Sequence, residues 1–235
     1  MGKIIQPELS HIPKRIRFVV FDLDGTLADT FEDIARATNS VLKAFGCPTL
    51  DTATIKQYVG RGARNLMIQA LGPDKEAFAD AATVLWREHY ERHPADHTNL
   101  YPGAVELLEW LRERDVRTGI LSNKFDGLTR QIAAAMGLSD RVDFVQGETD
   151  EFPRKPDPAL LDHLLDLYGV RRNEVLVVGD GEPDFELACN AGVAFCAVLT
   201  GLATREDWGR IGAPWVVGTL AELLEQLRHC GVCDR

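Results

Sequence analysis

Two aspartates, Asp22 and Asp24, stand just after an apolar run over 18–21, and their type and spacing point most directly to chemistry. Such a run is typical of a strand buried on both faces, and residues two apart in a strand point to the same side. Gly25 then permits the sharp turn by which the chain leaves the strand. Because two close carboxylates repel each other, the pair indicates a cation between them, although Asp-Gly-Thr is also ordinary turn chemistry.

Strand and helix patterns alternate in the second half of the chain. The expected strands cover 18–21, 117–122, 142–145, 174–179, 195–199 and, as a short one, 215–217. Such alternation predicts a parallel sheet with helices on both faces. The expected class is therefore α/β, with a Rossmann-like parallel sheet as its core.

Between the first two strands the chain shows only helical patterns. Thr30 to Asp33 resembles a capping box that would begin the first helix. The longest helix is expected over 77–90, with a core face formed by Phe78, Ala82, Leu85 and Trp86. The predicted organisation is a surface tail over 1–15, an α/β core of 16–29 and 97–235, and a small all-helical cap over 30–96 inserted into that core.

Composition and charge exclude several classes of function. A net charge of -10 makes the chain a poor partner for nucleic acid or an anionic membrane surface. No segment approaches the length of a membrane span, and the first residues lack the apolar core of a signal peptide. Five widely spread cysteines fit reduced thiols. We expect a cytoplasmic monomer or homodimer without nucleic-acid or membrane partners.

Polar side chains gather where the predicted strands end. Ser122, Asn123 and Lys124 follow the second strand, Lys155 lies in the loop after the third, and Asp180 and Asp184 follow the fourth. Ligands of open parallel sheets bind beyond these carboxyl ends. Carboxylates suit Mg²⁺ there, while a hydroxyl and an ammonium group suit phosphate oxygens.

Each of these features also has an ordinary explanation. Ser122 and Asp184 could cap helices, Lys155 could be a solvated loop lysine, and 179–181 could be a simple turn. Four such elements in this order, each at the end of a strand, favour a single site for a metal and a phosphate group.

The four elements resemble the four motifs of the haloacid dehalogenase superfamily. Asp22-Leu-Asp-Gly-Thr-Leu is similar to the first motif, Ser122 to the second, Lys155-Pro-Asp-Pro to the third, and Gly179-Asp180 with Asp184 to the fourth. The helical insert has the position of that family's small cap. Within the superfamily the chain most resembles the phosphoglycolate phosphatases, through its loop over 58–66, Ser122-Asn-Lys124 and Thr200-Gly-Leu-Ala.

The resemblance implies a magnesium-dependent phosphatase. Asp22 would form an aspartyl-phosphate, and Asp24 would act first as an acid and then as a base. Ser122 and Lys155 would stabilise the transferring phosphoryl group. The implied metal ligands are Asp22, Asp180, Asp184 and, through its carbonyl oxygen, Asp24. The implied substrate contacts are Thr26, Asn123, Arg61, Gly62 and Arg64.

The implied substrate is a small phosphorylated metabolite, first of all 2-phosphoglycolate, whose hydrolysis gives glycolate and phosphate. Arg61 or Arg64 of the cap would grip its carboxylate. The alternatives are a phosphomutase of the beta-phosphoglucomutase type, a pyrophosphatase or a sugar-phosphate phosphatase. Two other functions are disfavoured. Dehalogenation would need neither an acid at Asp24 nor Mg²⁺, and the sequence offers both. A protein that only binds its ligand would retain a costly cluster of unused carboxylates.

Overall fold

The sheet at the centre of the molecule has six parallel strands in the order β5-β4-β1-β6-β7-β8. The structure is a computed structural model and describes residues 12–233, so most of the tail predicted over 1–15 lies outside the described residues. The strands are β1 (Phe18–Phe21), β4 (Arg117–Phe125), β5 (Phe144–Glu148), β6 (Val175–Gly179), β7 (Ala194–Val198) and β8 (Val216–Val217). The predicted α/β class with a parallel sheet is confirmed.

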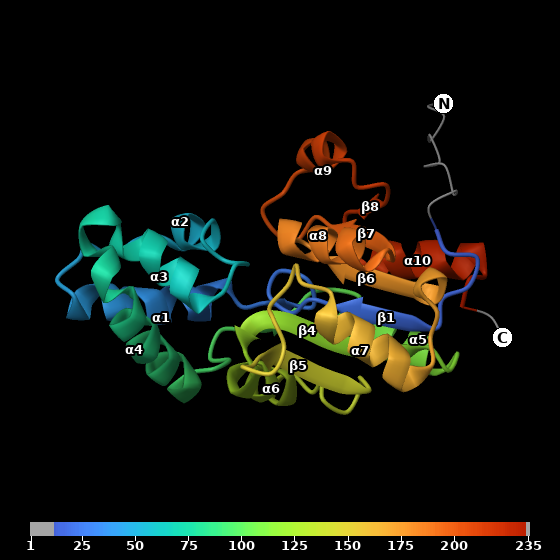
Figure 1. The fold of residues 1–235 in the computed structure, drawn as a ribbon, viewed down its shortest axis with the longest axis horizontal. Helices are drawn as coiled ribbons and strands as arrows, with labels where there is room; N and C mark the ends of the chain where they lie inside the picture. The colour runs from blue at the N-terminus through green and yellow to red at the C-terminus, as the bar shows by residue number, and fades with distance from the viewer. Residues whose placement is uncertain (1–11, 234–235) are drawn as a thin grey trace.

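Strand β1 lies between the two hydrophobic cores of the protein. Val19 and Phe21 face one core, and Phe18 and Val20 face the other, so the strand is buried on both sides. Helices α5 (Ala104–Arg112), α6 (Asp126–Ala135) and α10 (Leu220–Cys230) cover the first face. The opposite face carries α7 (Ala159–Tyr168), α8 (Glu182–Ala191) and α9 (Arg205–Ile211), and a short 3-10 helix, η3 (Arg172–Glu174), precedes β6 (Figure 1).

A helical lobe lies at one end of the sheet, on the left in Figure 1. It consists of α1 (Phe31–Ala44), α2 (Thr52–Lys56), α3 (Ala63–Leu71), the 3-10 helix η2 (Pro73–Phe78) and α4 (Ala79–Arg92). These helices occupy the insert that the sequence predicts to be helical, while the domain limits at 29/30 and 96/97 remain a prediction. In the described part of the chain, no helix is both long and apolar enough to cross a membrane.

The core face predicted for the longest cap helix is wrong in two positions. Phe78 is 51% exposed and Leu85 is 42% exposed, whereas Ala82 and Trp86 are buried as expected. The reason is that the helix begins only at Ala79, because the preceding residues form a 3-10 turn with a different angular period. The buried stripe of α4 runs through Ala79, Ala82, Trp86 and Tyr90, which leaves Leu85 on the solvent side.

The capping box predicted at the start of α1 is also wrong. The Thr30 hydroxyl donates to Asp24 Oδ1 at 2.5 Å instead of capping the helix. The buried Asp33 carboxylate accepts hydrogen bonds from the His97 backbone N–H and from the Thr98 hydroxyl, at 2.7 to 3.1 Å. Both side chains therefore serve the junction of lobe and sheet, where interactions distant in sequence replace local capping.

The two chain segments that connect the helical lobe to the sheet pair with each other. They form a two-residue antiparallel ladder of β2 (Ala28–Asp29) with β3 (Asn99–Leu100). Strands this short carry no periodic signal, so the sequence did not predict them. Helix α9 was missed as well, and β4 continues three residues beyond the predicted end at 122. This extension carries Asn123 and Lys124 toward the lobe.

Candidate active site

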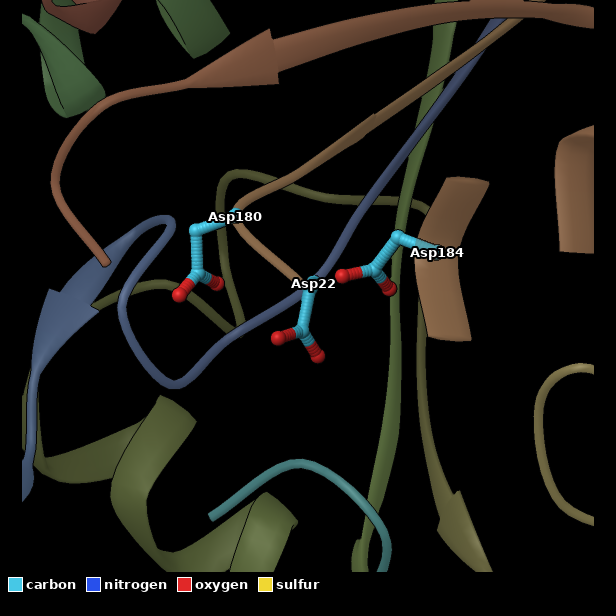
Figure 2. A group of neighbouring side chains, drawn as sticks. All are labelled: Asp22, Asp180 and Asp184. Carbon is cyan, nitrogen blue, oxygen red and sulfur yellow. The ribbon is translucent and has the colours of Figure 1, made fainter. Parts of the chain in front are cut away.

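Loops at one edge of the sheet bring four side chains together from distant parts of the chain. Asp22 follows β1, Asp180 follows β6, Asp184 lies in the first turn of α8, and Lys155 comes from the loop before α7. The carboxylates of Asp22, Asp180 and Asp184 point toward a common space (Figure 2). One oxygen from each lies within 4.8 Å of the others. The strand ends thus meet as the parallel topology requires.

Lys155 is the cation of this cluster. Its buried ammonium donates to Asp22 Oδ1 at 2.8 Å, to Asp184 Oδ1 at 2.7 Å and to the Leu121 carbonyl oxygen at 2.7 Å. Three acceptors use all three of its protons, so the side chain is held in one place. One ammonium faces three carboxylates, which leaves two negative charges uncompensated among these four groups.

The electrostatics of the cluster favour a bound divalent cation. Burial raises the pKa of Asp22 to about 7; Lys155 opposes this shift, while Asp184 and Asp24 add to it. Burial also raises the pKa of Asp180, with Asp22 and Asp184 adding to the effect. For Lys155 burial acts downward, but Asp184 and Asp22 raise the pKa overall. A hard divalent ion matches this all-oxygen donor set in charge and in chemistry.

Two glycines make the space that Asp180 occupies. A Cβ atom on Gly25 would lie 2.4 Å from Asp180 Oδ2, and one on Gly201 would lie 2.0 Å from the same oxygen. Gly25 also has a φ of +84°, which favours glycine. The Thr26 hydroxyl donates to Asp180 Oδ1 at 2.9 Å, so this residue, predicted to contact substrate, here orients a carboxylate. Gly201 lies in the segment Thr200-Gly-Leu-Ala that carries the family resemblance, but its contact with Asp180 was not predicted, because that contact is made across the fold.

Asp24 lies beside this cluster with partners of its own. Its Oδ1 atom is 2.8 Å from the Lys124 ammonium and accepts the Thr30 hydroxyl hydrogen bond. Ser122 is buried, and its Oγ accepts from the Lys124 backbone N–H at 3.2 Å. The sequence placed Lys124 among the polar residues at this strand end but assigned no role to its ammonium, although a lysine at the end of an apolar strand is unusual enough to signal a buried partner.

The side-chain amide of Asn123 connects three segments. Its Nδ2 donates to the carbonyl oxygens of Gly60 in the lobe and of Lys155, both at 3.0 Å. Its Oδ1 accepts from the Lys155 backbone N–H at 2.9 Å. Asn123 was predicted to contact substrate, but the structure places its side chain in a joint that fixes the lobe loop and the Lys155 loop.

A cavity of about 490 Å³ lies between the sheet edge and the helical lobe. Its walls include the acidic cluster, Asp24 and Lys124 on the sheet side and the loop with Arg61 and Gly62 on the lobe side. Further lining residues that the sequence did not single out are Lys56, Arg210 and Ile211. The space is thus closed by both parts of the chain.

The two arginines predicted to grip substrate lie in different places. Arg61 lines the cavity, is about half exposed, and has its guanidinium 3.2 Å from Glu182 and 4.0 Å from Glu186 of α8. Arg64 is not among the cavity-lining residues. It lies in the first turn of α3 and pairs with Asp80 at the start of α4, at 2.7 Å. The structure therefore brings Arg61 to the site and does not bring Arg64 there.

Comparison with known proteins identifies the family. The model of the haloacid dehalogenase-like hydrolases matches residues 19–198, which include every side chain of the acidic cluster. The chain belongs to this family. It is 34% identical to the phosphoglycolate phosphatase of Chromobacterium violaceum over 92% of this chain and 98% of that protein. It is 36% identical to that of Rhodospirillum rubrum, over 87% and 88%. The chain is accordingly a phosphatase of the haloacid dehalogenase-like type.

Solved structures agree on the fold of this haloacid dehalogenase-like enzyme. A putative phosphoglycolate phosphatase from Lactobacillus delbrueckii subsp. bulgaricus superposes with a TM-score of 0.85 at 24% identity, covering 91% of this chain and 98% of that one. A putative haloacid dehalogenase-like hydrolase from Bacteroides fragilis gives a TM-score of 0.81 at 26% identity, over 89% and 100%.

The contact between Gly201 and Asp180 can be tested by substitution. We expect Gly201→Ala to lower kcat/KM for a phosphate ester by about tenfold or more, because the new methyl group must displace the Asp180 carboxylate. The matched control is Gly209→Ala in α9, where nothing lies within 4 Å of the added carbon. It should keep its activity and gain up to about 1 kcal/mol of stability. Steady-state kinetics and thermal melting of both variants check this, and equal activities would contradict it.

Proposed function

We propose that the protein is a magnesium-dependent phosphomonoester hydrolase that acts through an aspartyl-phosphate on Asp22, with 2-phosphoglycolate as its substrate. One observation carries the proposal: Asp22 shares a cavity with two further carboxylates and a buried ammonium that also binds it. Such a set can hold a cation and a phosphate side by side. The names of the sequence relatives support the choice of substrate.

Asp22, Asp180 and Asp184 would hold Mg²⁺, together with the Asp24 carbonyl oxygen. When bound, the ion would offset the repulsion between the Asp22 carboxylate and an anionic phosphate group. Lys155 contributes independently of the metal, because its ammonium fixes Asp22 and Asp184 at 2.8 and 2.7 Å. Asp180 is likewise fixed without the metal: the Thr26 hydroxyl donates to it, and Gly25 and Gly201 leave the space that its carboxylate fills.

The residues of this chain can carry out both halves of the reaction. A carboxylate oxygen of Asp22 attacks phosphorus, a P–O bond forms on Asp22, and the P–O bond to the leaving alcohol breaks. Asp24 donates its proton to the leaving oxygen and then takes one from the water that cleaves the aspartyl-phosphate. Lys155 binds Asp22 and Ser122 lines the same cavity, and both would stabilise the charge on the transferring group.

The cavity also offers a partner for a second anionic group. Arg61 projects from the lobe loop and pairs with Glu182 and Glu186 through exposed contacts, which are weak enough to exchange for a ligand. A guanidinium binds a carboxylate through paired hydrogen bonds. In 2-phosphoglycolate the carboxylate lies one carbon from the ester oxygen, so both anionic groups fit within one cavity.

The nucleophile is tested with Asp22→Asn. We expect kcat to fall by at least about a thousandfold, because an amide cannot form the aspartyl-phosphate. The melting temperature should not fall, since the change also removes a buried charge. Inorganic phosphate released by the wild type should equal the ester consumed; a phosphomutase would return the group to a product instead. Retained turnover in Asp22→Asn would refute the mechanism.

The role of Arg61 is tested by comparing two arginines. We expect Arg61→Ala to lower kcat/KM for 2-phosphoglycolate about tenfold to a hundredfold and to change that for ethyl phosphate less than about threefold, since only the first offers a carboxylate. Arg64→Ala, outside the cavity, should resemble the wild type on both esters. An equal loss on both esters in Arg61→Ala would remove the carboxylate assignment.

The metal site can be tested without turnover. Because burial and like charges raise the pKa of Asp22 and Asp180, their ionised forms cost stability, and this cost grows as the pH rises above about 4. Asp180→Asn should therefore melt about 2–4 °C higher than the metal-free wild type at pH 8. Mg²⁺ should raise the melting temperature of the wild type, more at pH 8 than at pH 5, and that of Asp180→Asn much less.

The matched control for the metal site is Asp80→Asn, at an exposed aspartate that pairs with Arg64 and does not line the cavity. This variant should keep the full response to Mg²⁺. If Asp180→Asn also kept the full response, the acidic cluster would not be the metal site.

A further inference from the structure

We propose that Lys124 is a positioning residue that holds the acid–base carboxylate of Asp24 in place and connects its orientation to helix α4. The inference rests on the proposed function, in which Asp24 exchanges protons with the substrate and with water. Lys124 lies next to the reacting groups, and in the described part of the chain its ammonium contacts Asp24 and Tyr90 rather than the acidic cluster.

The position of Lys124 requires a buried partner. It lies on the part of β4 that extends past Ser122, and its side chain is only 3% exposed. Because the side chain is buried, water cannot solvate its ammonium, and a buried ammonium without a partner would cost several kcal/mol. Its ion pair with Asp24 Oδ1, at 2.8 Å, compensates that cost. The same contact opposes rotation of the Asp24 side chain, because rotation would remove Oδ1 from a buried ammonium.

The second partner of Lys124 belongs to the helical lobe. The ammonium donates to the Tyr90 hydroxyl at 3.1 Å and lies 4.5 Å from the centroid of the same ring. Tyr90 is fully buried on α4, and its ring stands edge-on to that of Trp86 at 5.0 Å. The Trp86 indole donates in turn to Thr38 of α1 at 3.1 Å. The place of Lys124 is therefore set by the packing of the lobe as well as by β4.

Both groups that hold Asp24 use the same oxygen. Lys124 and the Thr30 hydroxyl both bind Oδ1, at 2.8 and 2.5 Å. This leaves Oδ2 as the oxygen that can exchange a proton with a ligand in the cavity, which Asp24 lines. The two donors come from different elements, Lys124 from the sheet and Thr30 from the start of α1. Together they fix the carboxylate as a catalytic acid requires.

The test separates proton transfer from the rest of catalysis by means of the leaving group. An alkyl phosphate needs a proton on its leaving oxygen, whereas p-nitrophenyl phosphate releases a stable phenolate and does not. We expect Lys124→Met to slow single-turnover release of the alcohol from the alkyl ester by about 30-fold or more. Release of p-nitrophenolate should slow by less than about threefold. Single-turnover release is measured because later hydrolysis of the aspartyl-phosphate is common to both esters.

Three further variants make the result specific. Lys124→Arg keeps the charge and should restore part of the alkyl-ester rate. Tyr90→Phe removes the hydroxyl that Lys124 contacts and that also forms a side-chain hydrogen bond with Thr30, the other residue that holds Asp24, so it should show the same leaving-group dependence in weaker form. Lys56→Met is the matched control, since Lys56 lines the same cavity but donates to the Thr200 carbonyl oxygen and lies over the Phe31 ring. It should change both rates by the same factor.

A double-mutant cycle decides whether Lys124 acts through Asp24. In an Asp24→Asn background, Lys124→Met should add less than about threefold to the loss on the alkyl ester. Equal losses on the two esters, or full additivity with Asp24→Asn, would overturn the inference and make Lys124 a substrate ligand or a scaffold residue. If Lys124→Met does not fold, Tyr90→Phe decides, through the ratio of its rate loss on the alkyl ester to its rate loss on p-nitrophenyl phosphate. Failure of the proposed function is distinguishable, because it would appear as retained turnover in Asp22→Asn.

Discussion

The concentration of like charge at one edge of the sheet is the constraint on which the rest of this structure depends. Asp22, Asp180 and Asp184 approach one another within 4.8 Å, and Lys155 binds two of them. Burial and mutual repulsion raise the pKa of Asp22 and Asp180, so the cluster is costly in the ionised state. The surrounding structure must therefore hold these carboxylates in place against their mutual repulsion, and Lys155 offsets part of their charge.

The rigidity comes from the centre of the sheet. Strand β1 is buried on both faces, between β4 and β6, so the loop that carries Asp22 and Asp24 leaves a strand that neighbours hold on every side. Gly25 and Gly201 let two loops approach Asp180 so closely that any side chain would collide with it. Close apolar packing thus fixes the backbone at the sheet edge, and this fixed backbone sets the positions of the polar side chains there.

The second feature of the design is that the helical lobe reaches the reacting groups through buried polar contacts. Asn123 binds the Gly60 carbonyl oxygen, and Lys124 binds Tyr90 as well as Asp24. Thr30 and Asp33, at the start of α1, bind Asp24 and the returning crossing. These contacts make the lobe part of the catalytic arrangement, because the carboxylate expected to move protons is held from both sides.

The sequence by itself determined the class of fold, the family and the order of the four motifs. Short-range signals decide the fold class and the place of the site: an unbroken apolar run predicts a central strand, and aspartates two apart at its end predict a charged site. The family came from the resemblance of the four motifs to those of the haloacid dehalogenase superfamily. Alternation of strand and helix patterns then predicts which loops share an edge. For this reason Asp22, Asp180, Asp184 and Lys155 could be named before any coordinates.

Only the tertiary structure decided how the remaining polar side chains are used. Thr30 and Asp33 read as a helix cap but bind partners across the junction, Thr26 serves Asp180, and Arg64 turns away to Asp80. Lys124 and Gly201 matter because of neighbours that lie 100 and 21 residues away in sequence, at Asp24 and Asp180. A polar side chain with several possible partners bonds to the partner that folding brings within hydrogen-bonding distance. Local sequence does not show which distant residue that will be.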